Sequence, residues 1–154
     1  GRKKLMRKGK MKNSIVTIAM AMMLSVTAVV GFGTNAKAKN SSDKWYSFSN
    51  VNVSGDCAWQ VKEDTSKVYV HPVSGPAIYY TVQGLSAGTT YIASDKHVIP
   101  TGSKASITNH VFEWRIDTKN NPSAQLHMER KSYQPVDTSG YWSPDSIGTY
   151  TIYG

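Results

Sequence analysis

The chain has 154 residues, with 18 lysines and arginines against 10 acidic residues, and it contains a single cysteine. One cysteine excludes an intramolecular disulfide, so the fold must rely on its apolar core. Eight of the basic residues and none of the acidic ones precede residue 39, which leaves 10 basic and 10 acidic residues in a neutral segment 39–154. Because nucleic-acid binding requires clustered lysine and arginine on the folded domain, we expect no nucleic-acid partner.

Residues 1–38 have the three parts of a secretory signal peptide. Seven of the first 14 residues are basic, an uncharged apolar segment follows at 15–32, and Ala36 and Ala38 form an A-x-A cleavage site. Such a leader enters the membrane as a helix with its positive end in the cytoplasm. We therefore expect membrane contact only during export, and a secreted protein that is extracellular or loosely associated with the cell wall. An uncleaved anchor is the alternative, since the apolar segment is nearly long enough to span a bilayer.

Residues 39–44 are predicted to form a flexible neck, and residues 45–154 an all-β domain, a small antiparallel β-sandwich or barrel. Short runs that alternate apolar and polar residues between glycine, proline, asparagine and aspartate are typical of strands. In chain order the predicted strands lie within 45–53, 58–62, 67–71, 77–84, 89–94, 104–108, 110–116, 124–130 and 148–154.

Three features of the connections can also be predicted. In the first strand Tyr46 and Phe48 share a face, and a register change before Val51 indicates a β-bulge. Segments 86–89 and 119–123 have the composition of turns or loops. No amphipathic helix is expected after residue 39.

The sequence predicts no catalytic residue, no metal site and no cofactor. The histidines show no metal-ligand spacing; they are His71, His97, His110 and His127. A cysteine can act as a nucleophile beside a histidine base, but GDCAWQ around Cys57 matches no catalytic signature, which favours a buried thiol. Paired carboxylates can hydrolyse glycosides, and the candidates are Asp137, Asp145 and Glu113.

The aromatic residues are the strongest candidates for binding. All four tryptophans and all nine tyrosines follow residue 39. Outward rings can stack on sugars or dock to a protein, whereas inward rings fill the core and pair across strands. The candidate binding residues are Tyr79, Tyr80, Tyr141 and Trp142. Tyr79 and Tyr80 are adjacent, so in a strand they must point to opposite faces.

The segment SGYWSPDS, residues 139–146, has the composition of a structural corner. Gly140 permits a positive φ, Pro144 fixes its own φ, and Asp145 or Ser146 can cap a turn. Trp142 is then expected to fill one end of the sandwich. The predicted structural motif comprises Gly140, Trp142, Ser143, Pro144 and Asp145.

Three segments, 61–75, 98–114 and 137–150, carry the patterns D-x-S-x-V-Y-V, I-x-N-x-V-x-E and G-x-W-S-P-D-S-x-G-x-Y. In these patterns the chain resembles a set of small exported proteins of Gram-positive bacteria. The resemblance covers about residues 62–150 and implies export and an all-β fold, without a particular activity. A looser similarity to lactococcin-type bacteriocin precursors rests on the leader, the small β domain, the tryptophans and the lack of disulfides.

Three functions are consistent with these features. The leading hypothesis is an exported non-catalytic interaction module that acts at or near the cell envelope and binds a glycan or protein through exposed aromatic residues. The first alternative is a secreted bacteriocin-like antimicrobial protein. The second is a small secreted hydrolase.

Overall fold

A computed structural model of the protein describes residues 40–154. The predicted signal peptide, its helix and its cleavage site at Ala36 and Ala38 lie outside the described residues. Within residues 40–154 the regular elements are all β-strands, which confirms the all-β prediction. In the same part of the chain no helix has the length and apolar character needed to cross a membrane.

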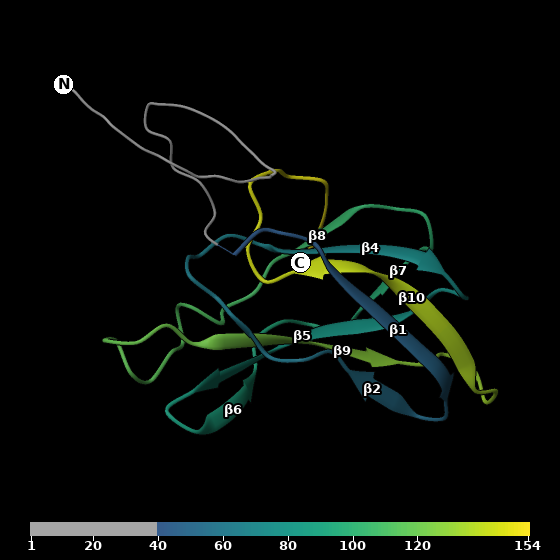
Figure 1. Cartoon of the computed structure of the whole chain (residues 1–154), viewed down its shortest axis with the longest axis horizontal. Coiled ribbons are helices and arrows are strands. Elements are labelled where there is room, and N and C mark those ends of the chain that lie inside the picture. Colours follow the sequence, from purple (N-terminus) through teal and green to yellow (C-terminus); the bar gives the residue numbers. More distant parts are fainter. Residues whose placement is uncertain (1–39) are drawn as a thin grey trace. The chain divides into compact units, whose positions relative to one another are not determined.

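The first sheet has five strands, in the order β1-β10-β4-β8-β11 (Figure 1). In this order the strands are β1 (Lys44–Val51), β10 (Val136–Ser143), β4 (Val68–Ser74), β8 (Ala105–Ile107) and β11 (Thr151–Tyr153). Neighbours are antiparallel except β8 and β11, which run parallel. The antiparallel prediction is therefore wrong for this last pair, because residues 144–150 carry the chain from β10 to the far edge of the sheet.

The second sheet is built on β9 and β5, and all of its pairs are antiparallel. Its main path is β2 (Ser54–Asp56), β9 (Ser123–Glu129), β5 (Ile78–Ser86) and β6 (Thr89–Ile92). Two short strands join this path: β3 (Gln60–Val61) pairs with β9, and β7 (His97–Ile99) pairs with β5. The two sheets are not closed into a barrel, so of the two predicted architectures the sandwich is the one adopted.

One apolar core lies between the sheets, and alternate residues of the strands supply it. The first sheet contributes Tyr46, Val68, Val70, Ile107 and Trp142, and the second contributes Ile78, Tyr80, Val82, Leu126 and Met128. Each fully buried side chain of this size stabilises the fold by about 1.5–3 kcal/mol. The Tyr46 and Tyr80 hydroxyls hydrogen bond to each other across the core at 3.1 Å. Residues next to these in each strand therefore face outward.

Two predicted backbone features are confirmed. The pairing of β1 with β10 shifts register between Phe48 and Val51, and Asn50 has a φ of 56° at this irregularity. The segment at 86–89 is a two-residue hairpin turn between β5 and β6, in which Ala87 and Gly88 have φ values of 50° and 77°. Two positive φ values identify the type I′ turn, whose twist matches that of the flanking strands.

The strand predicted at 110–116 is wrong, because this segment forms consecutive turns. The Asn109 side chain donates to the Ile107 carbonyl and accepts from the Val111 amide. The Trp114 amide then donates to the His110 carbonyl at 2.9 Å. Local side-chain bonds of this kind compete with strand pairing, and they end the extended chain after β8.

The predicted corner at 139–146 is also partly wrong, because its first half is the strand β10, which was not predicted. Gly140 lies inside β10, and the positive φ predicted for it does not occur. Glycine is needed there for space, since a Cβ would lie 2.4 Å from the His71 carbonyl oxygen and 2.6 Å from the Tyr46 hydroxyl. The corner itself begins at Pro144, immediately after the strand.

Candidate functional site

A row of three rings crosses the outer face of the first sheet. Trp45 of β1 is paired with Tyr141 of β10, and Tyr141 is paired with His71 of β4. The Trp45 and Tyr141 ring centroids are 4.9 Å apart with an interplanar angle of 63°, and those of Tyr141 and His71 are 6.4 Å apart. Trp45 is 54% exposed and Tyr141 is 37% exposed. We call Trp45, Tyr141 and His71 the aromatic row.

The alternation of the three strands puts these rings outside. Their chain neighbours Tyr46, Trp142 and Val70 are buried in the core, so the row itself must face away from it. Next to the row, Ser139 of β10 is paired with Ser47 of β1, and its hydroxyl hydrogen bonds to that of Ser74 in β4. The rings are therefore bordered by hydroxyl groups that can donate or accept hydrogen bonds.

A hollow of about 170 Å³ lies beside the row and is lined in part by Tyr69, Tyr150, Asp43 and Lys104. Tyr69 and Tyr150 have their ring centroids 5.1 Å apart, and the Lys104 ammonium lies 5.9 Å from the Tyr150 ring. Burial raises the pKa of Asp43, while the positive charges of Lys44, His71 and Lys104 oppose the rise. Asp43 thus connects the hollow electrostatically to His71 in the aromatic row.

The four predicted binding residues do not form one surface. Tyr80 and Trp142 lie in the core, where no partner can reach their rings. Tyr141 belongs to the aromatic row, whereas Tyr79 lies on the outer face of the second sheet, with the Lys96 ammonium 5.0 Å from its ring. Because the two sheets enclose the core, Tyr79 and Tyr141 face opposite directions and cannot share a small ligand.

Sequence reasoning missed Trp45 and His71 as members of the site. The signal for Trp45 was present, since placing Tyr46 and Phe48 on the buried face turns Trp45 outward. No pattern along the chain, however, shows that residues 45, 141 and 71 are register partners, because their strands are far apart in sequence and β10 was not predicted.

A second hollow, of about 350 Å³, lies on the outer face of the second sheet and is lined in part by Trp59, Gln83, Gln125 and Ile92. It offers one tryptophan beside two side-chain amides. The Gln125 amide already donates to the Cys57 carbonyl at 3.0 Å, so part of its capacity for hydrogen bonding is used inside the protein. The aromatic row presents three rings in register on one sheet face, and two of them, those of Trp45 and Tyr141, are exposed.

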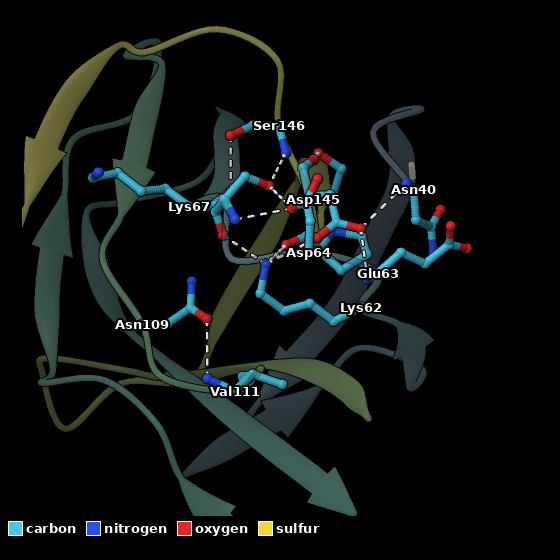
Figure 2. A network of polar contacts seen from close by, with 12 residues as sticks. Asn40, Lys62, Glu63, Asp64, Lys67, Asn109, Val111, Asp145 and Ser146 are labelled. Atoms are coloured by element: carbon cyan, nitrogen blue, oxygen red, sulfur yellow. Dashed lines mark hydrogen bonds and ion pairs between the residues drawn. The ribbon is translucent and has the colours of Figure 1, made fainter. Parts of the chain in front are cut away.

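Asp145 and Ser146, at the end of the motif at 139–146, belong to the polar network of Figure 2. The Asp145 carboxylate accepts a hydrogen bond from the Lys62 ammonium at 2.9 Å, and both side chains are 0% exposed. Lys62 also donates to the carbonyl oxygens of Ser66 and Pro144. The network thus joins the segment that follows β3 to the segment that follows β10. The Asp145 side chain therefore connects segments that are far apart in the sequence, instead of capping a local turn.

The network also includes the start of the described chain, within the predicted neck. The Asn40 amide donates to Asp145 at 3.2 Å, and the Asn40 side chain donates to the Val61 carbonyl at 2.7 Å. Ser143 donates to the Asp145 carbonyl, and Ser146 donates to the Lys67 carbonyl. The motif therefore has a clear structural role in tying three segments together.

The four histidines lie in separate surroundings. His71 is in the aromatic row, His97 lies beside Tyr153, and His110 stacks on Trp114 with ring centroids 4.4 Å apart. His127 bridges two carboxylates on an open sheet face, at 2.6 Å from Asp56 and 3.1 Å from Glu129. Within residues 40–154 no group of histidine, cysteine and acidic side chains could hold a metal ion.

The candidate nucleophile and paired carboxylates do not form a site with these histidines. Cys57 is buried, and burial together with the nearby Asp56 raises the pKa of its thiol to about 12, so it stays protonated at neutral pH. Asp137 lies near the start of β10 and Asp145 beyond its end. Six strand residues and Pro144 separate them, and an extended segment of that length spans about 20 Å or more, which exceeds the spacing used in glycoside hydrolysis.

The chain belongs to the family DUF2712, described as a protein of unknown function, which matches residues 34–146. This match covers the aromatic row and the buried network. No curated protein and no solved structure matches the chain.

Proposed function

We propose that this member of the DUF2712 family is an exported, non-catalytic module that binds a glycan of the cell envelope through the aromatic row. The observation that carries the proposal is the exposed Trp45–Tyr141 pair, with His71 in register beside it. The leader at residues 1–38 supports the exported location.

A glycan suits this surface chemically. The apolar faces of sugar rings can stack on tryptophan and tyrosine, and each aromatic contact contributes about 0.5–1.5 kcal/mol. Sugar hydroxyls need donors and acceptors nearby, which Ser47 and Ser139 supply in the next register pair on the same face of the sheet. Asp43 and Lys104 in the adjacent hollow add a carboxylate and an ammonium, so that glycans with amide or carboxylate substituents are favoured.

A protein partner fits the row less well. Stable protein interfaces bury about 800 Å² on each side around an apolar centre, whereas the row is bordered by serine hydroxyls and a hollow with two charged groups. The neutral charge of residues 39–154 gives no strong field to attract a charged macromolecule. A narrow row of rings with polar borders is better matched to a single extended saccharide.

The proposal is tested by retention on purified, insoluble cell-wall glycan. The protein is expressed with its own leader in an exporting bacterium, and bound and free fractions are measured. Trp45→Ala and Tyr141→Ala are each expected to weaken retention about 3- to 10-fold, as the loss of one stacking contact requires.

Trp114→Ala is the matched control, because Trp114 is 55% exposed but lies in the turns after β8. It is expected to bind as the wild type does. Equal retention of the Trp45→Ala and Trp114→Ala variants would contradict the proposal, as would a wild type that the glycan does not retain.

A further inference from the structure

Lys62 and Asp145 hold a nucleophile against a carboxyl group in a site without access to bulk water. The Lys62 Nζ lies 2.9 Å from the Asp145 Oδ1, and both side chains are 0% exposed. The nitrogen is fixed further by the carbonyl oxygens of Ser66 at 2.6 Å and Pro144 at 2.8 Å. Holding two reacting groups in this way can raise their effective concentration by many orders of magnitude.

The second carboxyl oxygen of Asp145 lies in a site that stabilises negative charge. Its Oδ2 accepts backbone N–H groups from Glu63 at 2.9 Å and from Asn40 at 3.2 Å. Two backbone amides that converge on one oxygen are the arrangement that stabilises tetrahedral intermediates in acyl transfer. The two oxygens of Asp145 are therefore distinct: Oδ1 faces the amine and Oδ2 faces the amides.

A second acidic side chain, Asp64, lies close to the Lys62–Asp145 pair. Its Oδ1 accepts hydrogen bonds from the amide of Ser66 at 2.9 Å and from the Ser66 hydroxyl, and the Ser66 carbonyl in turn accepts the Lys62 ammonium. Burial raises the pKa of Asp145, and Lys62 and the Glu63 amide only partly offset it. Burial also acts to raise the pKa of Asp64, but the hydrogen bonds from Ser66 outweigh this effect and hold the pKa of Asp64 below its usual value. Asp64 is therefore the carboxyl group better suited to stay ionised and accept a proton, and Asp145 is the one better suited to carry a proton.

The amine is also prepared for reaction. Burial lowers the pKa of Lys62, although the nearby Asp145 carboxyl opposes the shift. Burial therefore reduces the free-energy cost of forming the neutral amine and the neutral carboxylic acid from the ion pair. An amine is nucleophilic only in its neutral form.

We propose that Lys62 and Asp145 condense to form an intramolecular amide bond, with Asp64 as the proton-transfer residue. The ammonium of Lys62 first transfers a proton to Oδ1 of Asp145, which gives an amine and a carboxylic acid while Asp64 stays ionised. The Nζ lone pair attacks Cγ of Asp145, and the negative charge forms on Oδ2 between its two amide donors. Asp64 takes a proton from the attacking nitrogen and delivers it to Oδ1. The Cγ–Oδ1 bond then breaks and one water leaves, so no oxidant or further reactant is required.

The amide bond would give the fold a covalent cross-link that it otherwise lacks. It joins residues 83 positions apart in the chain, from the segment before β4 to the segment after β10. With one cysteine in the whole sequence, no intramolecular disulfide can do this. An exported protein without disulfides gains most from such a cross-link, because it restricts the unfolded chain.

Peptide mapping by mass spectrometry tests the proposal on the full chain, expressed with its leader in an exporting bacterium. Trypsin does not cleave after an acylated lysine, so peptide 45–67 should appear joined to peptide 132–154, lighter than their sum by one water. Separate peptides 45–62, 63–67 and 132–154 from folded wild type, after prolonged incubation, would overturn the proposal. So would a link that maps to another pair.

Three variants assign the roles. Lys62→Arg keeps a buried cation that cannot lose its proton and should give no link, whereas Lys67→Arg, at the neighbouring lysine, should link as the wild type does. Asp64→Asn keeps the shape of the side chain without its basicity and should slow linking about 100-fold or more. Circular dichroism shows whether each variant folds. An Asp64→Asn protein that links at the wild-type rate would overturn the role of Asp64.

Discussion

At the scale of single residues, adjacent side chains in this protein have different roles because the strands alternate. Trp45 lies on the surface and Tyr46 in the core, and Tyr141 and Trp142 repeat the same pattern one strand away. The sequence could show that neighbours point in opposite directions. It could not show which member of Tyr79–Tyr80 is buried, because that depends on which side of the strand the other sheet covers.

The backbone of β4 lies so close to Gly140 that this residue has no room for a side chain. A Cβ there would lie 2.4 Å from the His71 carbonyl oxygen, a backbone atom that cannot move aside without disturbing β4. We expect Gly140→Ala to lower the free energy of unfolding by about 3 kcal/mol, at the upper end of the cost of overpacking. Denaturant unfolding followed by tryptophan fluorescence measures the change.

Gly55→Ala is the control for this variant. Its Cβ would lie 3.5 Å from the nearest Phe48 ring atom, which is an ordinary contact. The free energy of unfolding is expected to change by about 1 kcal/mol or less. Equal losses at Gly140 and Gly55 would show that the close approach between β10 and β4 is not the cause.

At the scale of elements, most strands were predictable because period-2 alternation depends only on nearby residues. Two predictions were wrong for local reasons: the strand at 110–116 does not form, and β10 was not predicted. Residues 110–116 alternate like a strand, but the Asn109 side chain bonds to the backbone of its own segment and starts turns instead. β10 was missed because its apolar residues are interrupted by Gly140 and followed directly by Pro144, a composition typical of a turn.

The β5–β6 hairpin offers a test at this scale. Ala87 has a φ of 50°, and a left-handed conformation costs a residue with an ordinary Cβ about 1 kcal/mol. Because asparagine adopts this conformation more readily and favours type I′ turns, Ala87→Asn is expected to raise the free energy of unfolding by about 0.5 kcal/mol. Thermal or denaturant unfolding measures the gain.

Gly88→Ala, a substitution at the next residue that should have the opposite effect, provides the control. Gly88 has a φ of 77° and no atom within 4 Å of an added Cβ, so Gly88→Ala changes backbone strain without a clash. It should lower the free energy of unfolding by about 1 kcal/mol. A destabilised Ala87→Asn variant would be inconsistent with the type I′ geometry.

At the scale of the whole molecule, the Lys62–Asp145 network holds together segments that the strand pairing leaves separate. Asp145→Ala removes one partner of a buried pair and is expected to destabilise the fold by about 3–5 kcal/mol. Glu129→Gln at the Lys96–Glu129 pair is the matched control, because that pair is largely exposed and should contribute about 1 kcal/mol or less. Similar losses for the two variants in chemical denaturation would show that the network is not a main source of stability.

The sequence singled out both halves of this network as motifs, at 61–75 and 137–150, but gave no sign that they meet. Their contact depends on β10 and β4 being neighbours in the first sheet, and a pairing between strands so far apart in sequence leaves no local pattern. The aromatic row could not be predicted for the same reason, because its three residues come from three strands of that sheet. Of the four aromatic residues predicted for binding, only Tyr141 belongs to the aromatic row.

The four tryptophans allow the aromatic row to be tested as the glycan-binding site in one experiment, because each lies in a different place. Trp45 is in the aromatic row, Trp59 lines the other hollow, Trp114 is in the turns after β8, and Trp142 is in the core. A soluble cell-wall glycan fragment is titrated into ¹⁵N-labelled protein while the four indole N–H resonances are followed by NMR. The Trp45 resonance is predicted to shift in a saturable way while the other three stay in place. A saturable shift of Trp59 or Trp114 without Trp45, or no shift at all, would contradict the assignment of the aromatic row as the binding site.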